Sequence, residues 1–158
     1  MRLPRGLLCS YQAHKVSLSR RPFLRLYAAS PDAMSARPPE AVADAEVLAE
    51  LTSPVVLDVR DPAEVAAGKG GPPDRIPGSI NVPLNIDGAK QSERPTTPDE
   101  FFKAIAAKGV VLPYDAQIIT HCGSGGRGGK AAKILRDAGY DAYNGGGPAN
   151  IAAAREDA

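Results

Sequence analysis

The chain has 158 residues, of which 43% are hydrophobic and 23% are charged, an ordinary composition for one globular domain. No stretch of the sequence approaches the roughly 18 consecutive apolar residues that a membrane-spanning helix needs. The two cysteines, Cys9 and Cys122, are far apart in the chain. This spacing argues against a disulfide framework and against a cysteine-based zinc site.

The formal net charge of +1 hides an asymmetry. Residues 1–31 carry six of the basic residues and no acidic one, whereas the remainder carries thirteen basic and eighteen acidic residues. The rest of the chain is therefore acidic, and nucleic-acid binding needs a basic face. We expect no nucleic-acid partner.

Residues 1–30 have the composition of an organellar transit peptide, because they are rich in Arg, contain Ser and lack acidic residues. They have no continuous apolar core of the kind that a secretory signal requires. The run from Arg25 to Ser30 resembles both mitochondrial and plastid processing sites, so we expect a matrix or stromal protein without choosing the organelle. A basic tail that stays on the protein, or a wrongly assigned start codon, are the alternatives. Residues 31–39 are predicted to be a flexible spacer.

The domain is predicted to span residues 40–158 and to begin with a helix over 40–51, because apolar residues recur on one face. These residues are Val42, Val47, Leu48 and Leu51. The β-branched run 55–59 predicts a buried strand. Asp61 as N-cap and Pro62 in the first turn then predict a short helix.

Strands and helices are predicted to alternate through the rest of the chain. Two stretches, 68–79 and 85–96, are predicted to be loops because they are rich in Gly, Pro and polar residues. The other predicted elements are a strand at 80–82, a helix that Thr97 caps and Gly109 ends, a strand at 118–122, a helix at 127–138, a strand at 140–143 and a short closing helix. This alternation indicates a single α/β domain with a central, mostly parallel sheet flanked by helices.

The most informative segment is 122–129, in which five glycines follow Cys122 within seven residues and a helix begins. Cys122 lies at the end of a predicted parallel strand, which is where open α/β sheets bind ligands. Glycines let successive backbone N–H groups point at one centre, and a helix N-terminus adds about half a unit of positive charge. Arg127 adds a permanent cation. We therefore expect a lowered pKa at Cys122.

This segment has two alternative interpretations. A cysteine in a strand is often an inert small hydrophobe, and a Gly-rich turn between strand and helix often holds a nucleotide phosphate. The loop lacks the Gly-Lys-Ser/Thr ending of a phosphate-binding loop, and it comes late in the chain. The combination of Cys122, the glycines and Arg127 favours a nucleophilic or sulfur-carrying cysteine.

Four segments, in order, resemble the motifs of the rhodanese (sulfurtransferase) family. The Cys-x-x-Gly-x-Arg loop before Lys130-Ala131-Ala132 is similar to the family's active-site loop. The other three segments are Leu57-Asp58-Val59-Arg60 followed by Glu64, the run from Ile76 to Pro83, and the run from Ala138 to Gly147. The resemblance spans about residues 40–156.

The resemblance implies a single-domain sulfurtransferase that forms a persulfide on Cys122 and needs no cofactor or metal. The donor would be a small molecule such as thiosulfate or a persulfide, and the acceptor cyanide or a thiol, which a protein could carry. The persulfide would be stabilised by the backbone of Gly123, Ser124, Gly125, Gly126 and Arg127. Asp58 and Arg60 would brace the loop. We expect a monomer with no membrane span.

The chain departs from the family pattern at several positions. Gly123 replaces the Arg that often follows the cysteine, Gly128 replaces Ser or Ala, and Arg75 replaces the His before Ile-Pro-Gly. These changes predict a looser loop with less positive charge, and they bear on the donor more than on the fold.

Two rival functions remain open. A phosphatase or arsenate reductase would share the His-Cys pair and the Arg, but only four residues separate Cys122 from Arg127, whereas the phosphatase loop has five. A non-catalytic binding or regulatory module of the same fold is the other rival, with redox sensing by the cysteine as a related option. His121 is expected to be a packed strand residue.

Overall fold

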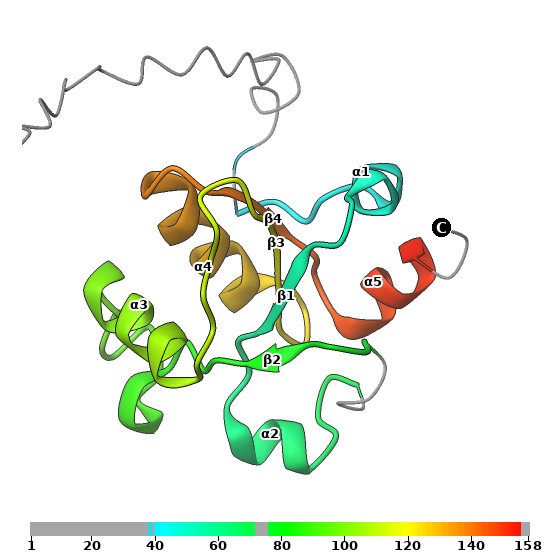
Figure 1. Ribbon diagram of the computed structural model, residues 1–158. Helices are drawn as coiled ribbons and strands as arrows, with labels where there is room; N and C mark the ends of the chain where they lie inside the picture. Colours follow the sequence, from blue (N-terminus) through cyan, green and yellow to red (C-terminus); the bar gives the residue numbers. More distant parts are fainter. Residues whose placement is uncertain (1–37, 39, 72–75, 156–158) are drawn as a thin grey trace, which may run out of the picture.

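The computed structural model describes residues 38, 40–71 and 76–155 (Figure 1). Their strands form one sheet in the order β2-β1-β3-β4, and every neighbouring pair is parallel. The strands are β1 (Val55–Asp58), β2 (Ile80–Asn81), β3 (Gln117–His121) and β4 (Asp141–Asn144). The predicted α/β class with a parallel sheet is confirmed. The predicted transit peptide and all of the predicted spacer but Pro38 lie outside the described residues.

Helices cover both faces of the sheet, as a parallel sheet requires. In Figure 1, α3 (Pro98–Ala107) and α4 (Gly126–Asp137) lie on one side, and α1 (Ala45–Glu50) and α5 (Pro148–Arg155) lie on the other. The remaining helical segments are α2 (Pro62–Ala66) and the 3-10 turn η2 (Ile86–Gly88). No helix in the described ranges is both long enough and apolar enough to cross a membrane.

The core has two parts because successive strand residues point to opposite faces of the sheet. Leu57 and Ile118 are fully buried with Phe101 on the side of α3 and α4. Val56 and Ile119 pack with the residues of α1 and α5 on the other side. The sheet thus lies between two apolar layers. The polar residues that end its strands belong to neither layer.

The first helix is shorter than predicted. It begins at Ala45 rather than at residue 40, because Val42 pairs with Asn144 in an isolated parallel bridge. The backbone N–H of Ala43 donates to the carbonyl oxygen of Asn144 at 2.8 Å, which holds this segment extended. Val47, predicted to share the buried face, is 37% exposed.

The cap of α3 is confirmed in detail. Thr97 Oγ1 accepts from the backbone N–H of Glu100 at 3.4 Å, and Glu100 Oε2 accepts from the backbone N–H of Thr97 at 3.0 Å. This reciprocal pair is a capping box. The predicted irregular loop over 85–96 contains η2, a short turn that its polar composition did not reveal.

The carboxyl ends of the central strands meet at one edge of the sheet. Asp58 lies in register with Asn81 on one side and with His121 on the other. The next strand in the chain, β2, pairs with one side of β1, and β3 pairs with the other side of β1. The direction in which successive strands are added to the sheet therefore reverses between β1 and β3. Ligands bind at such a reversal in open α/β sheets, and Cys122 follows β3 there.

Candidate active site

Cys122 begins a tight loop between β3 and α4. Its backbone N–H donates to the carbonyl oxygen of Gly146 at 3.0 Å, and its Sγ accepts from the backbone N–H of Gly125 at 3.1 Å. Gly125 has φ 96°, a left-handed conformation that glycine adopts without strain. That conformation turns the chain so that α4 begins at Gly126, and the first backbone N–H groups of α4 point toward Cys122 Sγ.

The pKa of the Cys122 thiol is lowered. Burial is the largest single influence and raises it, but backbone N–H groups of Gly128, Ser124, Gly125 and Arg127 act in the other direction and together prevail. The side chain is only 2% exposed. A thiolate held among amide donors is a nucleophile, and the same donors can receive negative charge that moves onto an attached sulfur atom.

Gly128 and Gly129 let α4 lie close to its neighbours. A Cβ atom on Gly128 would lie 2.7 Å from Asn144 Oδ1, and one on Gly129 would lie 2.5 Å from the carbonyl oxygen of Glu40. Both glycines are buried. The glycine after Arg127, expected to loosen the loop, is instead required by close packing.

Asn144 ties the loop to two other segments, the one that contains Glu40 and the turn at Gly146. Its side-chain amide donates to the carbonyl oxygens of Glu40 at 2.7 Å and Gly125 at 3.0 Å, and its Oδ1 accepts from the N–H of Gly146 at 3.0 Å. Thr120 Oγ1 donates to the carbonyl oxygen of Gly128 at 2.7 Å. These contacts fix the backbone whose amides surround the sulfur.

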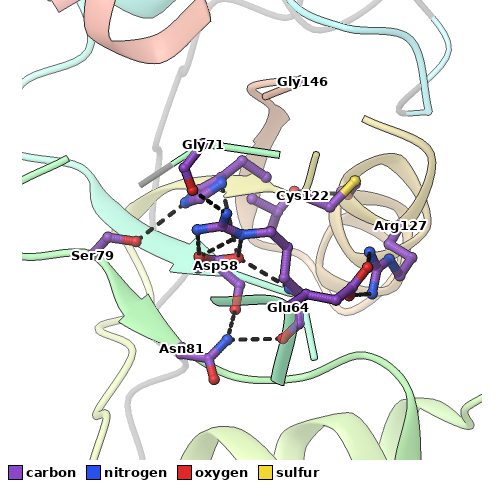
Figure 2. Close-up of polar contacts among 12 residues, drawn as sticks. Asp58, Glu64, Gly71, Ser79, Asn81, Cys122, Arg127 and Gly146 are labelled. Atoms are coloured by element: carbon purple, nitrogen blue, oxygen red, sulfur yellow. Dashed lines mark hydrogen bonds and ion pairs between the residues drawn. The ribbon is translucent and has the colours of Figure 1, made fainter. Parts of the chain in front are cut away.

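Arg127 lies in the first turn of α4 and is paired with acidic side chains (Figure 2). Its two terminal nitrogens donate to the Glu64 carboxylate at 2.5 and 3.0 Å, and Asp61 lies 3.5 Å away. The hydrogen bond from Arg127 is the main cause that lowers the pKa of Glu64 to about 2. Arg127 therefore links α4 to α2, and its charge is largely compensated.

Asp58 and Arg60 form a buried ion pair beside the loop. Arg60 Nη2 lies 2.5 Å from Asp58 Oδ2, and Arg60 Nε donates to both carboxylate oxygens at 2.9 Å. The remaining nitrogen of Arg60 donates to the carbonyl oxygens of Lys69 at 3.0 Å and Gly71 at 2.6 Å. This pair holds the segment 68–71.

The segment 68–71 in turn touches the cysteine loop. A Cβ atom on Gly70 would lie 2.7 Å from Gly123 Cα, and the Gly70 backbone has φ 87°. Glycine at position 70 allows the two backbones to meet, whereas a Cβ atom on Gly123 would make an ordinary contact of 3.5 Å with Gly70 Cα.

His121 is a packed strand residue, as expected. It is 1% exposed, and its Nε2 lies 3.2 Å from Ser79 Oγ (Figure 2 draws this contact). Burial is the main cause that lowers its pKa, and the Arg60 charge acts in the same direction. The ring is therefore neutral at pH 7 and does not line the pocket described next.

Cys122 is reached through a pocket of about 580 Å³. Its lining residues come from α2, from the segment 68–71 and from the cysteine loop with the first turns of α4. They are Glu64, Lys69, Gly70, Cys122, Gly123, Ser124, Gly126, Arg127 and Lys130. Within the described part of the chain, no three or more His, Cys, Asp or Glu side chains gather in a way that could hold a metal ion.

The structure thus brings every predicted site residue to one edge of the sheet. Gly123, Ser124, Gly126 and Arg127 line the pocket with Cys122, and Gly125 donates to the sulfur. Asp58 and Arg60 lie behind the segment 68–71 rather than in the pocket. Sequence reasoning missed four residues: Gly128 as an amide donor, Asn144 as a tie, and Lys69 and Lys130 as pocket residues.

Comparison with known proteins identifies the family. No protein of curated function matches the chain. A solved structure, SseA from Escherichia coli, described with the rhodanese fold of 3-mercaptopyruvate sulfotransferases, is 29% identical with a TM-score of 0.43. The match covers 70% of this chain and 42% of SseA. The family model of the rhodanese-like domain matches residues 42–148, more than half of the chain, and the chain therefore belongs to the rhodanese-like domain family.

Proposed function

We propose that the chain is a sulfurtransferase that carries sulfane sulfur as a persulfide of Cys122. The observation that carries this proposal is a buried cysteine with a lowered pKa, surrounded by backbone N–H donors and reached through a pocket. A thiolate needs no general base to attack. Membership of the rhodanese-like family supports the same chemistry.

In the first half-reaction the Cys122 thiolate attacks the outer sulfur of thiosulfate. A new S–S bond forms, the bond between the two sulfurs of thiosulfate breaks, and sulfite leaves with the electron pair. The terminal sulfur of the resulting persulfide carries the negative charge. The backbone N–H groups around the loop are the donors that stabilise this charge.

In the second half-reaction an acceptor removes that sulfur. Cyanide, or a thiolate in the cell, attacks the terminal sulfur, and the Cys122 thiolate leaves with the electrons of the broken S–S bond. No oxidant or reductant is consumed. Because the donor product leaves before the acceptor reacts, the kinetics are expected to be ping-pong.

Steady-state kinetics test this proposal. Initial rates of thiocyanate release, measured over a matrix of thiosulfate and cyanide concentrations, should give parallel double-reciprocal lines. Intersecting lines would contradict a covalent carrier. If thiosulfate, mercaptopyruvate and glutathione persulfide all fail as donors, the proposal is wrong, and the binding module takes its place. An aryl phosphate assay then tests the phosphatase.

We further propose that residues 1–30 direct the chain to a mitochondrion or a plastid and are removed there. The support is their Arg-rich, acid-free composition. N-terminal sequencing of the protein isolated from cells should give a start near residues 27–30. A mature chain that begins at Met1 would contradict this proposal.

A further inference from the structure

Glu64 is the one carboxylate among the described residues that line the pocket above Cys122. It lies on α2, where its Oε2 accepts from the backbone N–H of Asp61 at 3.0 Å as part of a capping box. This cap and the hydrogen bonds from Arg127 hold the side chain in place, with 22% of it exposed. Its pKa of about 2 keeps it ionised at neutral pH. A fixed negative charge therefore lines the route to the sulfur.

Glu64 also takes up the hydrogen-bonding edge of Arg127 (Figure 2). The two terminal nitrogens of Arg127 donate to the two oxygens of Glu64 at 2.5 and 3.0 Å, a two-point pairing. Asp61 places a second carboxylate 3.5 Å from Arg127. That edge of the guanidinium can bind a ligand only if Glu64 moves away. An anion that enters the pocket therefore meets an arginine that is already paired.

The other charges of the pocket provide little net attraction for a doubly charged anion. Lys69 and Lys130 are exposed, so water and salt screen their charges. With Arg127 they make three positive charges, which the two carboxylates and the cysteine thiolate balance. The backbone N–H groups of the loop already surround the thiolate. A dianion would lose part of its hydration in this pocket with little Coulombic gain in return.

We propose that Glu64 is a specificity-determining residue that disfavours doubly charged sulfur donors, such as thiosulfate, against donors that carry one charge or none. This inference rests on the proposed function and names its preferred substrate class: organic persulfides and thiosulfonates. With a persulfide R–S–SH, the Cys122 thiolate attacks the outer sulfur, the S–S bond breaks, and R–S⁻ leaves with the electron pair. The proton stays on the transferred sulfur. The pocket of about 580 Å³ has room for an organic group R.

Paired alkylating agents test the effect of Glu64 on anions without requiring turnover. Iodoacetate and iodoacetamide react with the same thiolate and differ by one charge, so their rate ratio at Cys122 cancels any change in thiolate fraction. The rates are read from the Cys122 peptide by mass spectrometry. Glu64→Gln removes the charge and keeps the size and the capping role of the side chain. The iodoacetate-to-iodoacetamide ratio should rise about fivefold, because a nearby negative charge is lost and Arg127 becomes available.

A matched pair of donors tests the same effect on turnover. Methanethiosulfonate has the sulfonyl-bound sulfane sulfur of thiosulfate, with a methyl group in place of one charged oxygen. In Glu64→Gln, kcat/KM for thiosulfate divided by kcat/KM for methanethiosulfonate should rise about fivefold, mainly through the KM for thiosulfate. Both donors transfer sulfur to the same thiolate, so a structural disturbance of the loop would change both constants alike and leave their ratio unmoved.

Glu46→Gln, at an exposed position on α1, is the control and should change neither ratio. An unchanged alkylation ratio in Glu64→Gln would overturn the inference, and so would a raised alkylation ratio with an unchanged donor ratio. An equal rise in Glu46→Gln would also overturn it, because net charge alone would then be the cause. If the unaltered chain makes no persulfide from any donor, the proposed function itself fails. Unchanged ratios in an active chain overturn only the donor preference.

Discussion

The ends of β1 and β3 lie side by side, yet they handle charge in opposite ways. At the end of β1 the charges of Asp58 and Arg60 are buried and compensate each other through side chains. At the end of β3 the sulfur of Cys122 is surrounded by backbone N–H groups. Register joins the two ends, because Asp58 pairs with His121, the residue before Cys122.

This difference gives the end of β1 a structural role and the end of β3 a chemical role. A side-chain ion pair is fully satisfied and has no capacity for another ligand, so the end of β1 serves as a brace. Backbone donors around a sulfur atom can accept extra negative charge, so the end of β3 is where a reaction can occur. Such donors require close backbone approach, and that accounts for Gly128 and Gly129, where a Cβ atom would clash, and for Gly125, which has a positive φ.

The largest expected effect is a loss of activity without a loss of stability when Cys122, at the end of β3, is replaced. Cys122→Ser should abolish sulfur transfer, because a serine hydroxyl is not ionised at neutral pH and cannot carry sulfane sulfur. Its melting temperature should stay within a few degrees of the unaltered chain, since the two side chains are nearly isosteric. Thiocyanate release and thermal unfolding measure the two quantities. Residual transfer above a tenth of the original rate would remove Cys122 from the mechanism.

The next prediction concerns the stability that the buried ion pair of Asp58 and Arg60 provides at the end of β1. Arg60→Leu leaves the Asp58 carboxylate buried and unpaired, and should lower the free energy of unfolding by about 3–5 kcal/mol. Arg94→Leu is the matched control, because it removes an ion pair with Glu100 at the surface and should cost about 1 kcal/mol or less. Urea denaturation measures both. Equal losses in the two variants would show that the buried pair is no brace.

A pair of glycine substitutions sharpens the account of the loop. Gly128→Ala places a Cβ atom 2.7 Å from Asn144 Oδ1, and should cost about 1–3 kcal/mol through overpacking. It should also raise the pKa of Cys122 toward its ordinary value, because the Gly128 N–H must shift. Gly126→Ala meets no atom within 4 Å, and should gain up to about 1 kcal/mol from helix propensity.

The pH dependence of iodoacetamide alkylation reports the pKa of Cys122 in these variants. In the unaltered chain its midpoint should lie below the value of about 8.5 for a free cysteine. A midpoint at or above that value, or an unshifted midpoint in Gly128→Ala, would contradict the role given to the amide donors.

The smallest effect concerns the link between α2 and α4. The pKa of Glu64 is about 2 in the folded chain, against an ordinary 4.5, so its pairing with Arg127 stabilises the fold above pH 4.5. This contribution is lost as the pH falls from about 4.5 toward 2. Glu64→Gln should therefore be less stable than the unaltered chain at pH 7, and the difference should shrink toward pH 2. Urea titrations at several pH values measure it.

The exposed residue Glu46 supplies the control for that titration. Glu46→Gln, on α1, should leave the pH dependence of stability unchanged. A difference between Glu64→Gln and the unaltered chain that stays constant from pH 7 to pH 2 would mean that the Arg127 pairing is not the cause.

Local patterns in the sequence predicted the sheet and the loop well. Short β-branched runs, caps such as Thr97 and helix-ending glycines such as Gly109 are signals that neighbours in the chain determine, and the structure confirms the elements they predict. The cysteine after β3 followed by glycines could be recognised for the same reason. The order of four motifs identified the family.

Contacts between distant segments could not be predicted in this way. The bridge from Val42 to Asn144, which shortens α1, joins residues about a hundred positions apart. The pairing of Arg127 with Glu64 spans 63 positions, and nothing local to Arg127 shows that its charge is compensated. The amide of Gly128 reaches the sulfur only because α4 packs closely on Asn144.

Intact-mass spectrometry of the purified chain tests the central claim most directly. After incubation with thiosulfate, Cys122 should gain one sulfur atom, about 32 Da, and cyanide should remove it, as a covalent carrier requires. Peptide mapping assigns the added mass to Cys122 rather than Cys9. A chain that gains no sulfur from thiosulfate, or that gains it in the Cys122→Ser variant as well, would contradict the account.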